Sequence, residues 1–178
     1  MIRKANISDL DSCYRCILDA KKYLKESGST QWNDPNDDYP SKDTILNDIK
    51  NGTCYVYDDN DEIFGMCVFI VGEDENYKII NGCWLSSQLP YLTIHRIAVR
   101  CDMRGKGVST ALLAYGINMM MELNLPSIKV DTHILNIPMQ MLLKHNGFIR
   151  CGVITLKRSN FDNKREAYEF VNPVFLVK

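Results

Sequence analysis

The chain has 178 residues, of which 46% are hydrophobic and 24% are charged, and its formal net charge at pH 7 is −1. This length and composition are typical of one globular domain, so we predict a single domain over residues 1–178. The balanced charge argues against nucleic-acid binding, and no run reaches the ~18 apolar residues that a membrane span needs.

The chain is predicted to begin with a strand and a helix. Ile2–Ala5 has the composition of a short strand. Ser8 and Asp9 can cap a helix whose apolar residues recur at helical spacing as far as Glu26. Gly28 is expected to end this helix, since glycine readily adopts the left-handed conformation of a C-terminal cap.

A polar, turn-rich stretch separates this helix from the next elements. Ser41–Lys50 is predicted to be a second helix with its first residue as N-cap. Thr53–Tyr57 and Glu62–Val71 are rich in strand-forming residues, with Asp58–Asp61 between them as a hairpin turn. This acidic turn does not match a calcium loop, because Ile63 stands where an EF-hand requires glycine.

Strands and helices alternate through the second half of the chain. A strand–helix–strand unit implies a parallel pair with a right-handed crossover, whereas the hairpin implies antiparallel strands. We therefore predict an α/β (α+β) fold with a mixed, mostly antiparallel central sheet and helices on both faces. The expected strands are Tyr77–Leu85, Tyr91–Val99, Ser127–Thr132, Phe148–Leu156 and Glu166–Val171, and the expected helices are Gly107–Leu123 and Ile137–His145.

Seven cysteines are scattered along the chain, most of them in apolar runs. This pattern indicates reduced, buried thiols in a cytoplasmic protein. Cys13 and Cys16 have C-x-x-C spacing, but no second pair completes a zinc site. We interpret them as two helix residues one turn apart, with a metal or redox role as the alternative.

A basic, glycine-containing turn connects the strand at Tyr91–Val99 to the helix that follows. Gly105 and Gly107 let backbone N–H groups approach a ligand closely, and Arg104 and Lys106 add positive charge. The first N–H groups of a helix lack intrahelical partners, and the helix dipole adds partial positive charge there. These features indicate a pyrophosphate site. The alternative is a glycine-softened turn with solvated charges.

The spacing of this turn differs from two common phosphate motifs. An ATP-binding P-loop has its lysine after the second glycine, whereas Lys106 lies between the glycines and Val108 follows Gly107. A dinucleotide fingerprint has a third glycine where Thr110 stands. A nucleotide- or phosphate-binding module of another class is therefore disfavoured.

The sequence Arg-Gly-Lys-Gly-Val-Ser at 104–109 resembles the coenzyme A signature of the GNAT superfamily of acyl-CoA N-acyltransferases. The preceding His-Arg-Ile-Ala-Val strand, Asn136 after the next strand, and Gly147-Phe148 after the short helix follow in the family's order. The resemblance covers nearly the whole chain. It implies a GNAT-like sheet in which a parallel strand pair splays apart and binds acyl-CoA there, with acetyl-CoA as cosubstrate and no metal.

The resemblance also implies roles for individual residues. Backbone groups of Ile97, Ala98 and Val99 would pair with the pantetheine amides like an added strand. Asn136 would contact the cofactor, or cap the following helix, or both. The backbone amides that would hold the pyrophosphate are those of Arg104, Gly105, Lys106, Gly107, Val108, Ser109 and Thr110.

The family reaction is direct attack of a neutral amine on the thioester, which requires a base to take the amine proton. His95 is our candidate, since an unperturbed imidazole titrates near ~6.5, and a hydrogen-bonded histidine of the sheet is the alternative. Asp131 and His133 are weaker candidates. Leu143 stands where many relatives carry the tyrosine that protonates the leaving thiolate, so the usual acid is in doubt.

The acceptor is expected to bind near Gln31–Tyr39 and the closing strands. Trp32 and Tyr39 either line that cleft or serve as packing aromatics. Three aspartates of this segment would favour a cationic acceptor, although an acidic loop is often only solvated. They are Asp34, Asp37 and Asp38. We expect a small-molecule or peptide amine as partner, leave a homodimer open, and expect neither nucleic acid nor membrane.

Two functions on the same fold follow from these residues. The first is an acetyl-CoA-dependent N-acetyltransferase that acts on a primary amine. The second is a non-catalytic acyl-CoA-binding sensor, which Leu143 keeps open because fold alone does not determine function.

Overall fold

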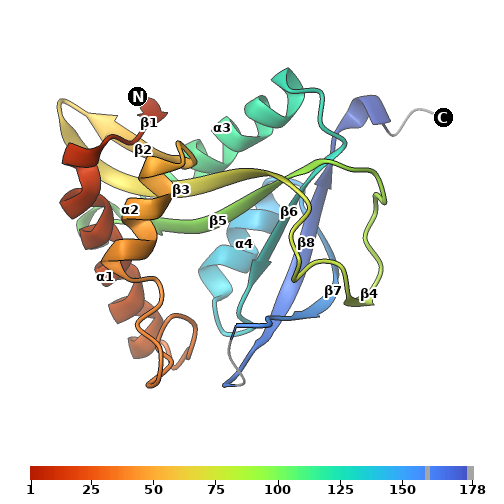
Figure 1. Cartoon of the computed structure of the whole chain (residues 1–178), viewed down its shortest axis with the longest axis horizontal. Helices are drawn as coiled ribbons and strands as arrows, with labels where there is room; N and C mark the ends of the chain where they lie inside the picture. Colours follow the sequence, from red (N-terminus) through yellow and green to blue (C-terminus); the bar gives the residue numbers. More distant parts are fainter. Residues whose placement is uncertain (159–160, 176–178) are drawn as a thin grey trace. The chain divides into compact units, whose positions relative to one another are not determined.

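The computed structural model describes residues 1–158 and 161–175. Within them the chain forms eight β-strands and four α-helices (Figure 1). It divides into two compact units. The first unit combines Met1–Phe69 with His95–Tyr115, and the second combines Ile70–Ile94 with Gly116–Lys178.

The strands form a mixed sheet in the order β1-β2-β3-β5-β6-β8-β7-β4. Only β5 and β6 are parallel among the described registers, through Leu92 with Ile128 and Thr93 with Lys129. The other described registers are antiparallel, which confirms the predicted fold class. The strands are β1 (Ile2–Lys4), β2 (Cys54–Asp59), β3 (Glu62–Gly72), β4 (Ile80–Gly82), β5 (Tyr91–Val99), β6 (Ser127–Thr132), β7 (Ile149–Thr155) and β8 (Lys164–Val171).

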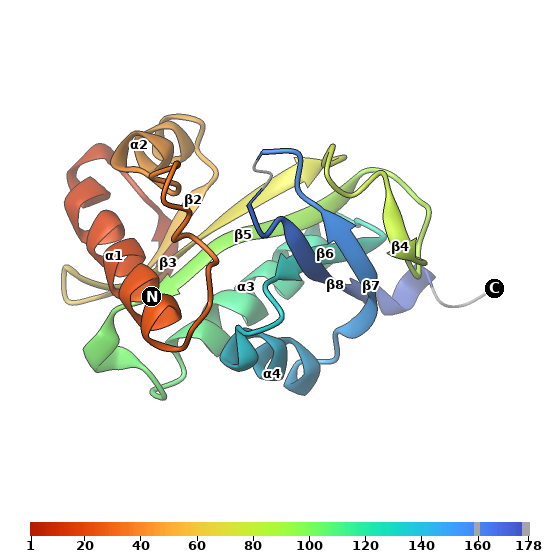
Figure 2. The same cartoon turned by 90° about the horizontal axis from the view of Figure 1, so that it is seen from below.

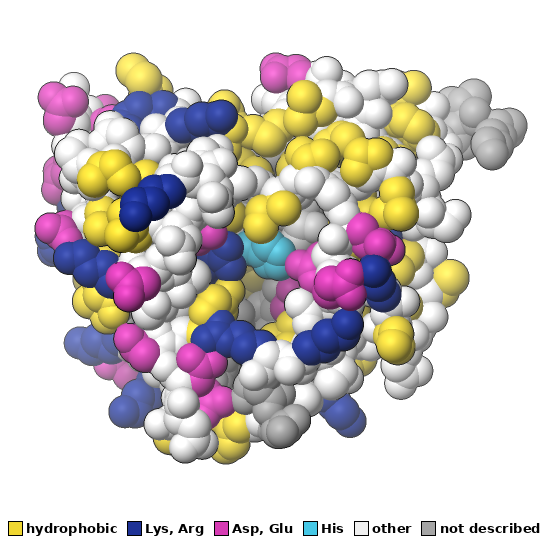
Figure 3. Space-filling view, viewed as in Figure 1, with side chains coloured by type: hydrophobic (Ala, Val, Ile, Leu, Met, Phe, Trp, Pro, Cys, Tyr) yellow, Lys and Arg dark blue, Asp and Glu magenta, His cyan; other side chains and the backbone are white. Residues whose placement is uncertain are grey.

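Two helices of the first unit, α1 (Leu10–Glu26) and α2 (Lys42–Lys50), lie side by side in both views of the cartoon (Figures 1 and 2). Their solvent side carries interspersed positive and negative side chains rather than one charged patch (Figure 3). The ion pair between Lys42 and Asp11 joins the two helices on this side.

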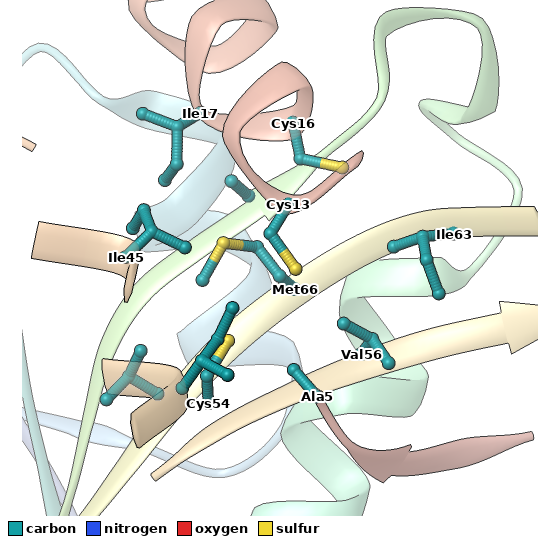
Figure 4. Close-up of a cluster of buried hydrophobic side chains, with 12 residues drawn as sticks. Ala5, Cys13, Cys16, Ile17, Ile45, Cys54, Val56, Ile63 and Met66 are labelled. Carbon is teal, nitrogen blue, oxygen red and sulfur yellow. The ribbon is translucent and has the colours of Figure 1, made fainter. Parts of the chain in front are cut away.

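The inner sides of α1 and α2 pack on one face of β2 and β3, because each element presents apolar residues at its own period. Figure 4 shows this cluster around Cys13 and Met66, both 0% exposed. Its other members are Ala5, Cys16, Ile17, Ile45, Ile49, Cys54, Val56, Ile63, Val68 and Ala98.

The opposite face of β2 and β3 packs against the first half of α3 (Val108–Glu122). Tyr55 alternates with the clustered residues of β2, and its ring lies 5.5 Å from that of Tyr115 on α3. Gly65 is required in β3, because a Cβ there would lie 2.7 Å from Cγ1 of Val108. Helices therefore cover both faces of the sheet within the first unit, as predicted.

The second unit contains α4 (Ile137–His145) and the strands β6, β8, β7 and β4, which are neighbours in that order. The ring of Phe148, which follows α4, lies 5.4 Å from that of Phe170 on β8. Elsewhere in this unit, Tyr77 and Tyr91 stack with ring centroids 6.4 Å apart beside Ile154. This unit therefore has an apolar cluster of its own.

Two sequence predictions of local structure need correction. Of the predicted caps Ser8 and Asp9, Asp9 is the N-cap residue of α1, but the capping side chain is that of Asn6: it accepts from the Ser8 N–H, while Asp9 accepts from the Asn6 N–H at 2.8 Å. The strand predicted at 77–85 is only Ile80–Gly82. Tyr77 instead sits in a turn, in which its N–H donates to the Asp74 carbonyl at 3.0 Å, and its own carbonyl accepts the Trp84 indole N–H at 2.9 Å.

Candidate active site

The predicted anion-binding turn is built from backbone groups at the start of α3. Gly105 and Gly107 adopt φ values of +74° and +83°. The N–H of Ala111 donates to the carbonyl of Gly107 at 2.9 Å, which is the first hydrogen bond of the helix. The N–H groups of 108–110 precede this bond and have no partner within the helix. With the helix dipole they favour an anion.

Glycine is required at these two positions by the backbone angles and not by crowding. Left-handed conformations are costly for a residue with a Cβ. A Cβ at Gly105 or Gly107 would meet no described heavy atom within 4 Å, and both residues are exposed. The Cβ positions of both glycines therefore face open space among the described residues.

The side chain of Arg104 ties this turn to α1. Its Nη2 donates to the carbonyl of Asp19 at 2.9 Å, and its guanidinium lies 4.0 Å from the ring centroid of Tyr23. The Asp19 carboxylate also accepts from the Cys101 N–H at 2.8 Å. These contacts hold the turn against α1, and the contribution of the Arg104 charge to anion binding stays a prediction. Lys106 is exposed at the turn.

The segment predicted to bind pantetheine, Ile97–Val99, is the last part of β5. Beyond it the Arg100 N–H donates to the Phe64 carbonyl of β3 at 2.9 Å. The described parallel ladder with β6 involves Leu92 and Thr93. Ile97–Val99 lies past this ladder, as the predicted pairing with an extended ligand requires.

A kink interrupts β5 just before this segment. Arg96 has a φ of +52°, a region that costs a non-glycine residue of order 1–3 kcal/mol. Its Nε and Nη2 donate to the two carboxylate oxygens of Asp48, each at 2.8 Å. Its Nη1 donates to the Tyr39 hydroxyl at 2.6 Å. The guanidinium thus bridges β5, α2 and the segment before α2.

The charges of this pair are largely removed from solvent, since the side chains of Arg96 and Asp48 are 10% and 11% exposed. Burial raises the pKa of Asp48, while the charges of Arg96 and His95 oppose that rise. Burial also acts to lower the pKa of Arg96, but Tyr39 and Asp48 outweigh it and raise the pKa. The two-point geometry is that of a guanidinium–carboxylate pair, so we assign the pair as ionised. His95, half-buried, is the neighbouring residue of β5.

Sequence reasoning did not single out Asp48 or Arg96. A signal was present, because Asp48 stands at helical spacing from Ile45 and beside Ile49 on the apolar side of α2. Arg96 likewise interrupts an apolar strand. A charged residue at a position expected to be buried needs a partner of opposite charge, which would have paired these two elements.

Residues 17–148 match the sequence model of the acetyltransferase (GNAT) family. The chain belongs to this family. A GNAT family acetyltransferase from Streptococcus agalactiae is 30% identical to it, with a TM-score of 0.86 over 97% of this chain and 95% of that chain. No curated protein matches the sequence.

More distant GNAT structures share the fold. The chain is similar to a GNAT family acetyltransferase from Listeria monocytogenes at 20% identity, with a TM-score of 0.72 over 97% of this chain and 94% of that chain. It is also similar to a chain of the NatC complex bound to Gag peptide and CoA, at 16% identity, with a TM-score of 0.64 over 97% and 98% of the two chains.

Asn136 and Leu143, both implied by the GNAT resemblance, lie in the second unit. Asn136 is the N-cap of α4, where its Oδ1 accepts from the Met139 N–H at 3.4 Å. The capping interpretation is thus confirmed, and the contact to the cofactor stays a prediction. Leu143 is 0% exposed, so its side chain belongs to the core.

The two weaker candidates for the GNAT base are each hydrogen-bonded. Asp131 accepts from the Tyr77 hydroxyl at 2.7 Å. Nδ1 of His133 accepts from the Leu135 N–H at 3.2 Å, so in the neutral ring Nε2 carries the proton and donates to Asp162 at 2.9 Å. To take a proton from an amine, neutral His133 would have to give up the hydrogen bond that its Nδ1 accepts, whereas the Asp131 carboxylate has further lone pairs.

In the segment expected to recognise the GNAT acceptor, several side chains contact other residues of the first unit. Trp32 packs against the α1–α2 core, which supports its interpretation as a packing aromatic. Asp38 pairs with the Lys21 ammonium at 2.9 Å, and Asp34 accepts from the Asn36 N–H at 2.9 Å. The Lys21 charge weakens the pull that Asp38 would exert on a cationic acceptor.

The described cysteines are all free, and Cys13 and Cys16 are buried one turn apart in α1. Burial raises the pKa of Cys16 to about 12. Within residues 1–158 and 161–175, no three His, Cys, Asp or Glu side chains gather as metal ligands would. In the same ranges no helix is long and apolar enough to cross a bilayer.

Proposed function

We propose that this GNAT acetyltransferase moves the acetyl group of acetyl-CoA to a primary amine. The observation that carries the proposal is the turn in which Gly105 and Gly107 take left-handed conformations ahead of the first helical amides. Such a turn suits a diphosphate. We assign the pyrophosphate to the amides of Arg104–Thr110, the pantetheine arm to Ile97–Val99, and a further cofactor contact to Asn136.

The chemistry is direct transfer. The amine nitrogen attacks the thioester carbonyl carbon, the C–S bond breaks, and coenzyme A leaves as the thiolate. His95 takes the amine proton, because an ammonium has no lone pair with which to attack. Leu143 has no proton to give, so the thiolate leaves with hydrogen-bond help and takes a proton from water.

The remaining parts of the proposal concern the protein as a whole. The family match spans residues from both units, which supports one functional domain over 1–178. The acceptor is a small-molecule or peptide amine. The NatC relative was solved with a peptide and CoA, which supports including peptides in the test. A cytoplasmic location is supported by the free described cysteines.

Thermal-shift titration tests the cofactor. Acetyl-CoA and CoA should each raise the Tm, whereas ATP and NAD should not, because only ligands that bind the native state stabilise it. Equal stabilisation by ATP would instead indicate a general nucleotide site.

A thiol-release assay over polyamines, aminoglycosides and lysine- or N-terminal-amine peptides tests the transfer. At least one class should accelerate release above hydrolysis. The buried Leu143 favours one alternative, a non-catalytic acyl-CoA sensor. Binding of acetyl-CoA without amine-stimulated release over the whole panel would establish that alternative.

The pH profile of an active amine tests His95. His95→Ala should keep CoA affinity and remove the acidic limb of the kcat profile, whereas the exposed His145→Ala should preserve it. An unchanged profile in His95→Ala would assign the proton to another acceptor.

A further inference from the structure

The kink in β5 is held by side chains that lie far away in sequence. Arg96 at φ +52° is strained, so contacts elsewhere must hold it in that conformation. Three hydrogen bonds from its guanidinium meet this need, two to Asp48 and one to Tyr39. Their donor–acceptor distances of 2.6–2.8 Å are short for N–H···O bonds.

The main partner of Arg96 is itself firmly placed. Asp48 is 8% exposed and lies next to Ile49 in the last turn of α2, which packs in the core of the first unit. Its carbonyl accepts from the Thr53 N–H at 3.0 Å and from the Thr53 hydroxyl at 3.1 Å. Because the backbone of Asp48 is held in this way, its carboxylate can fix the guanidinium and, through it, the backbone of β5.

The kink has a geometric consequence for its neighbours. Along an extended strand successive side chains point to opposite faces, and a left-handed residue breaks this alternation. His95 precedes the kink and Ile97–Val99 follow it. The conformation of one residue, Arg96, therefore sets how the proposed base is oriented relative to the backbone proposed to hold the thioester arm.

We propose that Asp48 and Tyr39 are positioning residues that act through Arg96 to hold β5 kinked, so that His95 faces the thioester carried by Ile97–Val99. This role rests on the proposed function. The pyrophosphate turn makes none of these hydrogen bonds. Loss of the kink should therefore reduce turnover far more than cofactor affinity.

The kinetics of single variants test whether these residues affect turnover more than cofactor affinity. Asp48→Asn and Arg96→Ala should lower kcat about 10- to 100-fold, because small misplacements of reacting groups have effects of that size. The Kd for CoA should stay within about threefold of wild type. Tyr39→Phe should show a smaller loss of kcat in the same direction.

Asp9→Asn is the matched control. Asp9 is also 8% exposed and accepts two hydrogen bonds from one guanidinium, that of Arg3, at 2.7 and 3.1 Å in the same unit. This variant should lower the Tm and leave kcat unchanged. A loss of kcat in Asp9→Asn as large as in Asp48→Asn would overturn the positioning role.

The pair Arg96→Gly and Arg96→Ala separates the kink from the charge. Both variants remove the guanidinium, but glycine adopts φ +52° freely whereas alanine does not. At an ordinary strand position glycine is the less stable of the two. We expect the reverse here, with Arg96→Gly higher in both Tm and kcat.

A Tm and kcat of Arg96→Ala equal to or higher than those of Arg96→Gly would refute the inference. A wild type without turnover on any amine would refute the proposed function, and the positioning role with it. The Tm ranking would still report whether the side chains hold a strained backbone, so the two failures are distinguishable.

Discussion

Two segments of the first unit adopt left-handed backbone conformations close together in sequence, and they do so by opposite means. The turn at 104–110 uses Gly105 and Gly107, which are exposed and need no help. The kink in β5 uses Arg96, whose buried ion pair with Asp48 holds it. A left-handed backbone can thus be intrinsically allowed, as in the turn, or held by side-chain contacts, as in the kink.

If the kink depends on side chains, removing Asp48 should have the largest effect on folding. Asp48→Ala leaves the Arg96 guanidinium buried without its carboxylate, and we expect a loss of about 3–5 kcal/mol in the free energy of unfolding. Asp11→Ala removes an exposed pair with Lys42 and should lose no more than about 1 kcal/mol. Urea denaturation measures both. Similar small losses would mean that the kink needs no support.

If the turn depends on glycine and open space, filling the space should prevent binding. Gly107→Trp should weaken CoA binding at least ~100-fold, or about 2.8 kcal/mol, because the side chain would occupy the diphosphate position. Gly28→Trp is the control, since Gly28 has a similar φ of +79° and equally open surroundings. Calorimetry should show loss of affinity only in Gly107→Trp. Equal affinities would place the cofactor elsewhere.

Gly65 packs between β5, just after the kink, and the start of α3, just after the turn. A Cβ there would lie 2.7 Å from Val108, at the start of α3, and 3.1 Å from the carbonyl of Ala98 in β5. Gly65→Ala should therefore destabilise the fold by about 1–3 kcal/mol through overpacking. Thermal unfolding measures this loss. If Gly65→Ala kept the Tm of the wild type, α3 could shift away from the strand without loss of stability.

The smallest expected effects distinguish Arg104, whose side chain holds the turn against α1, from Lys106, which contributes charge. Arg104→Ala removes the contacts to Asp19 and Tyr23, and should weaken CoA binding roughly threefold at both low and high salt. Lys106→Ala should weaken it by a similar factor only at low salt, because ions screen an exposed charge. Identical salt dependence in the two variants would contradict the tethering role of Arg104.

Local pattern predicted much of the fold. The bounds of β5, β6 and α4 match the predicted 91–99, 127–132 and 137–145, because apolar runs end there at residues that cap or turn the chain. The N-terminal cap was only partly predicted: Asp9 is the N-cap residue of α1, but the capping side chain is that of Asn6, since Asn6, Ser8 and Asp9 are all good cap residues and sequence alone does not rank them. β4 is shorter than predicted because the Tyr77 N–H bonds to the Asp74 carbonyl and closes a turn there.

The candidate site divides in the same way. The sequence alone determined the family resemblance and the turn that we propose as the anion site, because glycine spacing and the start of a helix are local properties of the chain. Only the tertiary structure revealed that Arg104 is a tether and that Arg96 is held in a strained conformation. Both depend on partners more than forty residues away, Asp19 and Asp48, and no local pattern encodes which distant side chain compensates a buried charge or a strained residue.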